Sequence, residues 1–384
     1  MFQKLWRIGL ALCTALCLLA CCGGCWSGRE LGKLLVVMGV GLDADPSGQT
    51  LQVTAQAAKA ADMGKTEGGS GPAYWNLNSS GTDPFTALRR MTGQAGKQLY
   101  LSHNQVLVIG RELAEQGVQD ALDYFLRDRE NRTNVWVIVA DGTAADLLDF
   151  EPAMERLPAR QLAEQIKSRS DTGEWPAVDL LEFTNQLMER SRAPVAPLVA
   201  LIQDGDAQTA QVVGTAVFRD DQMTGSLNAA ETRGMLWSTG EVESAALQAD
   251  LEGDQIAVEM VSATGALAPV LGEDGSVTMR VEIHAEGYIS AQSGDRNFAD
   301  PQNVDRLEES LCQTIRAEVE AAFQKAQALR TDIYGLGNRI HEKYPHIWEQ
   351  LEENWHDRFS QVTLETKVDV RVSSTGRLVE PTYP

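Results

Sequence analysis

The chain has 384 residues, and its 33 lysines and arginines face 54 aspartates and glutamates, which gives a formal net charge of −21. A surface this acidic repels nucleic acid and anionic lipid headgroups, so it excludes a nucleic-acid-binding protein and attachment to a membrane by net charge. Five of the six cysteines crowd the first 25 residues, and Cys312 stands alone in the remainder. That remainder cannot form an internal disulfide, and it is long enough for two or three domains with hydrophobic cores.

The N-terminal segment has the pattern of a signal peptide. Lys4 and Arg7 precede an apolar stretch that runs from Ile8 to Cys22. This stretch has about 15 residues, whereas a membrane-spanning helix needs roughly 20. A cleaved signal of an exported protein is therefore favoured over a permanent membrane helix.

Two cysteines are candidates for a lipid anchor. Bacterial lipoprotein precursors carry an apolar residue three places before the modified cysteine and a small residue directly before it. Leu18-Leu19-Ala20 before Cys21 fit this rule well, whereas Cys25 follows Gly24 but has Cys22 at the apolar position. The local rule therefore favours Cys21. Because the charge of the body cannot hold it on a membrane, the acyl chains would have to do so.

The first region predicts a hairpin and then a strand, a helix and a strand. The apolar run 34–40 and the alternating segment 51–55 flank a turn at 45–48, and the strands expected at 106–109 and 135–139 flank a helix at 114–126. This order favours a mixed sheet that is partly parallel. Gly39-Val40-Gly41 is followed by a turn and lacks the helix of a phosphate-binding loop, so no nucleotide site is predicted.

The later regions predict a middle domain and a C-terminal domain. A proline-flanked helix within 173–197 is typical of a connector, and it precedes a strand at 210–218, a helix at 229–237 and a strand around 256–260. The segments 260–268 and 277–285 predict a hairpin across a turn at 273–275, and an amphipathic helix at 307–329 and a strand at 362–372 follow. A second helical stretch, at 340–355, is expected between that helix and that strand.

The expected fold is mixed α/β (α+β), with three domains that have mixed sheets. The long helix is expected to pack on the C-terminal sheet, with a coiled-coil partner helix as the alternative. The predicted division is a signal peptide at 1–24, an N-terminal domain at 25–195, a small middle domain at 196–255 and a C-terminal domain at 256–384.

No catalytic, metal or cofactor site is predicted. His341 and His346 are five residues apart on a helical stretch and point about 140° away from each other, which does not suit a shared metal ion. Ser102 and His103 are adjacent on an extended chain, so they point to opposite faces, and no nucleophile elbow accompanies them. The abundant carboxylates do not single out a catalytic pair.

The densest charged cluster is the run from Arg127 to Arg132, at the end of a predicted helix. Its ordinary interpretation is a solvated network of ion pairs that caps the helix. Docking of a partner is the alternative, and Arg127, Asp128, Arg129 and Glu130 are the candidate contact residues.

Taken together, these segments resemble the spore germination lipoproteins, the Ger(x)C family, which is the C subunit of GerA-type nutrient germinant receptors. Four blocks carry the resemblance in order along the chain: 25–31 with 37–43, 101–110 with 122–130, 214–218 with 227–236, and 332–355 with 367–376. The first reads Cys25-Trp26 and then Arg29-Glu30-Leu31, close to the opening Cys-Trp-Asp-x-Arg-Glu-Leu of the family. Ser27 stands at the usual aspartate.

The resemblance implies that Cys25 carries the lipid, with Cys21 as the alternative from the local rule. It also implies three mixed α/β domains and anchorage on the outer face of the spore inner membrane. It further implies assembly with the integral membrane A and B subunits, no catalytic activity and no cofactor. The competing hypothesis is a solute-binding lipoprotein of a transporter, in which two lobes would flank a cleft.

Overall fold

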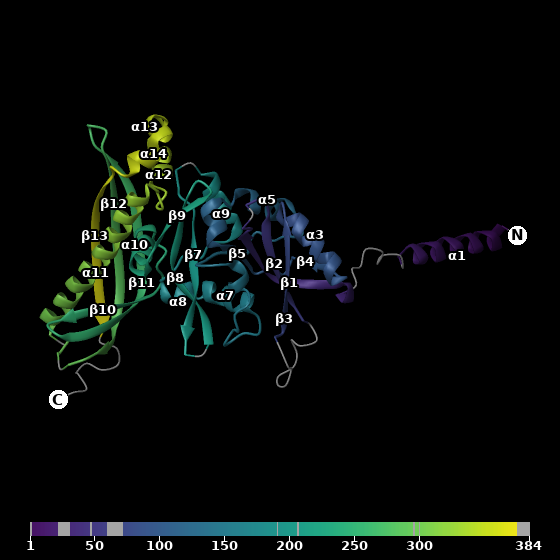
Figure 1. Cartoon of the computed structure of the whole chain (residues 1–384), viewed down its shortest axis with the longest axis horizontal. Coiled ribbons are helices and arrows are strands. Elements are labelled where there is room, and N and C mark those ends of the chain that lie inside the picture. The colour runs from purple at the N-terminus through teal and green to yellow at the C-terminus, as the bar shows by residue number, and fades with distance from the viewer. Residues whose placement is uncertain are drawn as a thin grey trace.

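The computed structural model describes residues 2–21, 31–46, 48–59, 72–189, 191–205, 207–294, 296–298 and 300–374. Helix α1 (Phe2–Cys21) covers most of the predicted signal segment, and its side chains from Phe2 to Thr14 are exposed. In these ranges no helix is long and apolar enough to cross a bilayer. The rest of the described chain is built around two mixed sheets (Figure 1), which confirms the mixed α/β class.

The first sheet has parallel strands at its centre and antiparallel strands at both sides. In the described part of the chain its order is β3-β2-β1-β5-β6-β7-β8-β9, with β4 paired to β1. The parallel strands are β1, β5, β6 and β7. The bounds are β1 Leu34–Ala44, β2 Leu51–Ala58, β3 Tyr74–Gly81, β4 Gln98–Tyr100, β5 Val106–Gly110, β6 Trp136–Ala140, β7 Val195–Asp204, β8 Ala207–Arg219 and β9 Gln222–Leu227. The predicted hairpin at 34–55 and the parallel pairing are confirmed.

Helices cover both faces of this sheet, which is why β5 and β6 are continuous apolar runs. Val106, Val108 and Ile138 pack with α6 (Ala144–Leu147) and α7 (Pro158–Lys167) on one face. Leu107 and Val137 pack on the other face with helices α3 Pro84–Ala95, α4 Arg111–Gln116, α5 Gln119–Arg127 and α9 Leu180–Met188.

The single helix predicted at 114–126 was wrong. The chain forms α4 and α5 with a break at Gly117, whose φ of 130° is a conformation that glycine adopts readily and other residues rarely do.

The two glycines of Gly39-Val40-Gly41 let helices approach β1 closely. A Cβ added at Gly39 would lie 2.7 Å from the Cβ of Ala159 at the start of α7, and one at Gly41 would lie 3.0 Å from the Cβ of Ala144 in α6. Close packing of helices on the sheet therefore requires glycine at these positions.

The second sheet has the order β10-β11-β12-β13, and helices cover only one of its faces. Its strands are β10 Ala245–Leu251, β11 Asp254–Leu271, β12 Val277–Gln292 and β13 Thr363–Ser374. Helix α11 (Pro301–Leu329) packs on the apolar face, as predicted. The hairpin across 273–275 is also confirmed. The strands expected separately at 256–260 and 260–268 are instead one long strand, β11, because its bulges at 257–262 bend the pairing without ending it.

The helical stretch predicted at 340–355 is a chain of short helices. Helix α12 (Leu336–Lys343) ends before Pro345, which begins α13 (Pro345–Leu351), because proline lacks the backbone N–H that would continue a helix. The stretch closes with η2 (Glu352–Asn354) and α14 (Trp355–Phe359), and the rings of Trp348 and Trp355 lie 5.3 Å apart, edge to face.

Helix α10 (Ala229–Thr239) lies between the two sheets (Figure 1). It contacts β8 and β9 of the first sheet, β11 and β12 of the second, and α11 along its length. A Cβ at Gly234 would lie 2.0 Å from the backbone oxygen of Glu318, so glycine brings α10 against the backbone of α11.

The expected middle region 196–255 contributes β7, β8 and β9 to the first sheet and β10 to the second. Its independence as a domain stays a prediction.

Candidate functional site

The two cysteines predicted to carry a lipid stand before the folded body. Cys21 is the last residue of α1, and Cys25 lies outside the described residues. The described chain resumes at the 3-10 turn η1 (Leu31–Lys33), which leads directly into β1. Lipidation at either cysteine stays a prediction.

Three segments meet where the chain enters the parallel strands. We call residues 31–33, 96–105 and 127–135 the amino edge, because they precede β1, β5 and β6 and the second of them contains the short strand β4. Leu34 pairs with Gln98, and the N–H of Gln105 donates to the carbonyl of Met38 at 2.9 Å. The hydroxyl of Ser102 donates to the carbonyl of Glu130 at 2.9 Å. Residues that are far apart in the sequence therefore share one surface.

The predicted charged run lies on this amino edge, and some of its residues pair within the chain whereas others are exposed. Arg127 pairs with Asp123 one turn earlier in α5, at 2.7 Å, and the carboxylate of Asp128 accepts the N–H of Glu130 at 2.7 Å. Burial and the neighbouring Asp128 raise the pKa of Tyr124. Arg129 and Arg132 are exposed. The capping network therefore uses half of the run, and contact of Arg127, Asp128, Arg129 and Glu130 with a partner stays a prediction.

Ser102 and His103 have structural neighbours instead of catalytic ones. Ser102 holds the loop of Glu130, and the ring of His103 meets the ring of Tyr100 edge-on at 5.7 Å. His341 and His346 lie on separate helices, α12 and α13, and His341 stacks on Trp348. Within the described ranges, no group of three His, Cys, Asp or Glu side chains is placed to hold a metal ion.

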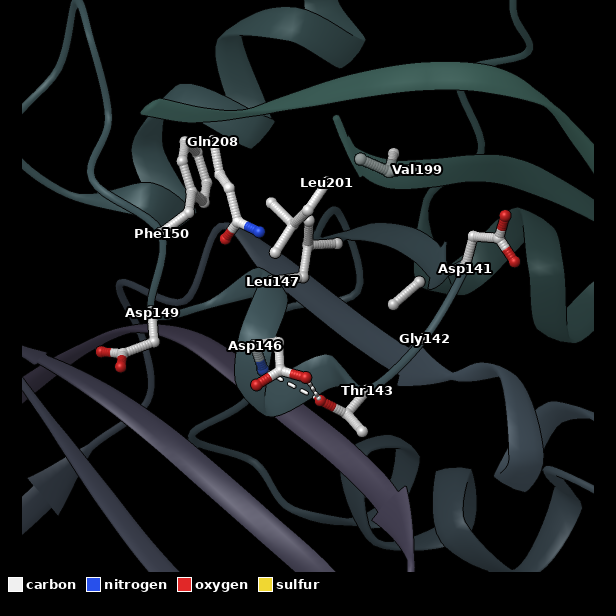
Figure 2. A pocket seen from close by; sticks show the side chains of 11 residues that line it. Asp141, Gly142, Thr143, Asp146, Leu147, Asp149, Phe150, Val199, Leu201 and Gln208 are labelled. Carbon is white, nitrogen blue, oxygen red and sulfur yellow. Dashed lines mark hydrogen bonds between the residues drawn. The ribbon is translucent and has the colours of Figure 1, made fainter. Parts of the chain in front are cut away.

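A hollow of about 500 Å³ opens at the carboxyl end of β6, beside α6. Figure 2 shows Leu147 and Leu201 in its middle, with Asp149 and Asp141 at opposite sides. Asp141 pairs with Arg111 at 2.5 Å, Asp146 accepts the hydroxyl of Thr143 at 2.6 Å, and Asp149 accepts the amide of Asn76 at 2.9 Å. Each of these three carboxylates therefore has a partner within the chain.

Asp43 holds the first turn of α6 against the end of β1. Its carboxylate accepts the N–H groups of Ala144 at 2.7 Å and Ala145 at 3.0 Å. Burial raises the pKa of Asp43, although these two hydrogen bonds act in the opposite direction. This carboxylate caps a helix and fixes the wall of the hollow.

A buried ion pair joins α10 to α11 at the junction of the two sheets. Both carboxylate oxygens of Glu318 are used, because Arg233 donates to one and the indole N–H of Trp237 donates to the other at 3.0 Å. Glu318 is 6% exposed. The hydrogen bonds to Glu318 raise the pKa of Arg233, which keeps it charged.

A second buried carboxylate, that of Asp332, organises the turn before α12. It accepts the N–H groups of Tyr334 at 3.1 Å and Gly337 at 2.8 Å, together with the indole N–H of Trp355 at 3.1 Å. Burial raises the pKa of Asp332 to about 6. The backbone oxygen of Asp332 also accepts the N–H of Ala193, which ties this turn to the segment before β7.

Sequence reasoning did not assign Asp43, Glu318 or Asp332. Asp43 and Asp332 lie inside the resembling blocks, two residues after Gly41 and three before Gly335, and an acid close to a glycine is a signal for a turn or cap that could have pointed to them. Glu318 had no such signal, because it is one of many acids on a long helix.

Two family models match nearly the whole body. Residues 27–201 match the spore germination protein N-terminal domain, and residues 213–376 match the spore germination B3/GerAC-like C-terminal domain. The chain belongs to the GerAC-like spore germination protein family. The first match spans β1 to β7, and the second runs from β8 to the end of the described chain.

Relatives in this family align along their full length. Spore germination protein KC of Bacillus subtilis (strain 168) is 23% identical and covers 92% of each chain, and spore germination protein B3 of the same strain is 22% identical over 94% of this chain and 96% of its own. The crystal structure of the GerBC protein superposes with a TM-score of 0.55 at 18% identity, and it covers 87% of this chain and 97% of the other. The family assignment and the fold are thus supported independently.

Proposed function

We propose that the chain is a membrane-anchored lipoprotein subunit of a spore nutrient germinant receptor, required for germination and without catalytic activity of its own. It is held on the outer face of the spore inner membrane, where it assembles with the integral A and B subunits. One observation carries the proposal: the two germination-family matches follow each other through the body, and the first begins two residues after Cys25.

The carboxylates described above have structural partners within the chain. The hydrogen-bonded carboxylates found here, Asp43, Glu318 and Asp332, hold helices and turns in place, and the hollow beside α6 has its acids engaged. A solute-binding role has less support, because this hollow lies against the first sheet alone. The run Arg127, Asp128, Arg129 and Glu130 stays the candidate contact with the A and B subunits, and contact of the same surface with lipid headgroups is the competing proposal.

The anchor is tested by intact-mass and N-terminal peptide analysis of protein extracted from membranes. We expect a diacylglyceryl mass on Cys25, and we expect Cys25→Ala to remove it while Cys21→Ala keeps it. Lipid on Cys21 would keep the anchor and correct the alignment at the N-terminus. An unlipidated chain in the soluble fraction would contradict the anchor.

The germination role is tested by deleting the gene in a strain without redundant receptors. We expect spores that fail to respond to nutrients and recover when the wild-type gene is restored. Complementation with Cys21→Ala/Cys25→Ala separates the anchor from the body, because a folded but unanchored body should not restore the response. Normal nutrient-triggered germination after deletion would refute the proposed role.

A further inference from the structure

The amino edge carries positive charge on an otherwise acidic protein. Its segments hold five cations, Lys33, Lys97, Arg127, Arg129 and Arg132, against two carboxylates, Asp128 and Glu130. Lys33, Lys97, Arg129 and Arg132 are exposed. In the part of the chain that the structure describes, Lys97, Arg129 and Arg132 have no carboxylate within ion-pair distance.

The strand order brings these cations together. Lys33 and Lys97 immediately precede the paired residues Leu34 and Gln98 of two parallel strands, so they are neighbours at the start of β1 and β4. The loop with Arg129 and Arg132 is held beside them by the bond from Ser102 to Glu130 and by the N–H of Trp136, which donates to the carbonyl of Gln105 at 3.0 Å.

Exposed apolar side chains flank the cations. Leu126 is 40% exposed at the end of α5, and Leu181 is 50% exposed at the start of α9. The N–H of Leu181 donates to the carbonyl of Thr133 at 3.1 Å, so this leucine lies next to the loop of Arg132. Cations beside leucines are the composition of a surface that meets lipid headgroups.

The predicted anchor is close to this edge along the chain. Six peptide steps separate Cys25 from Leu31, and an extended chain spans at most about 3.6 Å for each step, so Leu31, the first residue of the amino edge, lies within about 22 Å of a lipidated Cys25. A tether of this length allows the edge to reach the headgroups, where the potential of anionic lipids acts within roughly 10 Å. Figure 1 shows β1 and β4 at the end of the body opposite the four-stranded sheet.

We propose that the amino edge rests on anionic lipid headgroups of the membrane that holds the anchor. This inference builds on the lipid anchor of the proposed function. The cations at the edge attract the headgroups while the acidic remainder is repelled, so the body takes one orientation, with the four-stranded sheet pointing away from the membrane. The acyl chains attach the protein to the membrane, and the amino edge sets the orientation of the body.

The test measures acylation rates of single lysines in the lipidated full chain, reconstituted into phosphatidylcholine vesicles with or without phosphatidylglycerol. Lys33 and Lys97 report on the edge, and the exposed Lys343 and Lys367 serve as distant controls. We expect phosphatidylglycerol to slow acylation at Lys33 and Lys97 about fivefold, with reversal at high salt and no change at the controls. Equal rates in both vesicles would overturn the inference. Protection that appears only when the integral A and B subunits are present would overturn it too, in favour of a protein contact.

Matched variants test the same inference independently. Lys33→Gln/Lys97→Gln/Arg129→Gln/Arg132→Gln removes four exposed cations from the edge. Arg339→Gln/Lys343→Gln/Lys367→Gln/Arg371→Gln removes two lysines and two arginines, all exposed, from the C-terminal half. Only the first set should abolish the difference between the two vesicles at the amino edge, read by amide hydrogen exchange of 97–105. An equal effect of both sets would show that net charge alone matters.

Flotation separates this inference from the anchor. Failure of the wild-type chain to float with phosphatidylcholine vesicles would count against the anchor and would not test the edge. In that case the chain is coupled chemically through Cys25 to a lipid, which replaces the natural attachment. Phosphatidylglycerol should then still slow acylation at Lys33 and Lys97, and equal rates in both vesicles would overturn the inference.

Discussion

The two sheets of this protein differ in how many of their faces are covered by helices. In the first sheet, helices cover both faces, so β5 is buried at every residue from Val106 to Gly110. In the second sheet, α11 covers one face, and β12 alternates between buried and exposed residues through most of its length. On the open face, cross-strand pairs such as Arg280 with Glu365 and Thr278 with Thr363 replace hydrophobic packing.

This difference decides where a substitution matters. A residue in the parallel strands of the first sheet has a packed neighbour whichever way it points, whereas in the second sheet every other residue faces water. Five predictions test the contrast, ordered from the largest expected effect to the smallest.

A buried charge should unfold the first sheet from either face. Val108→Asp and Leu107→Asp point to opposite sides and should each lower the free energy of unfolding by at least about 4 kcal/mol, because neither carboxylate would have a partner. In the second sheet Ile283→Asp should do the same, whereas Thr264→Asp on the open face should cost less than about 1 kcal/mol. Urea unfolding measures all four, and tolerance of Val108→Asp would contradict the two-sided packing.

Breaking the buried pair at the junction should be the next largest effect. Glu318→Ala leaves Arg233 and the indole of Trp237 without their acceptor, and we expect a loss of about 3 kcal/mol in the free energy of unfolding. Glu320→Ala, on the exposed side of the same helix, is the control and should change little. Equal effects of the two variants would show that Glu318 contributes no more than a surface acid.

Adding a side chain under α7 should strain the close packing on β1. Gly39→Ala places a Cβ 2.7 Å from that of Ala159, and we expect a loss of about 2 kcal/mol in chemical unfolding. Gly93→Ala is the control, because Gly93 lies in α3 with no atom near its added Cβ. That variant should gain about 0.5 kcal/mol from better helix propensity, and a loss at Gly93 as large as at Gly39 would refute the packing argument.

Asp332 should make stability depend on pH. Because burial raises its pKa from 3.8 to about 6, the folded state binds the proton more tightly than the unfolded state does. Its contribution is fully present below about pH 4 and is lost as the pH rises through 6. Asp332→Asn should therefore flatten the fall in stability between pH 4 and 6, measured by urea unfolding at several pH values. An unchanged slope would mean that another group titrates there.

The exposed pairs should have the smallest effect. Arg280→Ala removes a pair with Glu365 that is open to solvent on both sides, so its cost should be at most about 0.5 kcal/mol and should vanish at high salt. Thermal unfolding in low and high salt measures it. A loss comparable to that of Glu318→Ala would contradict the distinction between covered and open surfaces.

Most of the fold was predictable, because burial leaves a direct trace in the sequence. Apolar runs marked β1, β5 and β6, alternation marked β12 and β13, and a four-and-three spacing marked α11. The predictions were wrong where the local apolar pattern did not decide where an element begins or ends. Gly117 divided the helix expected at 114–126, and β11 continued through its bulges where two strands were expected.

The site was less predictable, because its parts come from distant segments. The run 127–132 was recognised as charged, yet only the parallel pairing of β1 with β4 shows that Lys33 and Lys97 lie on the same edge. In the same way, nothing in the local sequence distinguishes Glu318 from its acidic neighbours, since its role depends on Arg233 and Trp237, more than 80 residues earlier.

Helix α10 has a consequence for how the molecule responds to heat. Six of its eleven residues are buried, and the helix packs against β8 and β9, against β11 and against α11. Melting of either sheet would expose this helix, so we expect the two sheets to share one transition in calorimetry instead of melting as separate units. A substitution that destabilises the four-stranded sheet should therefore also destabilise the first sheet.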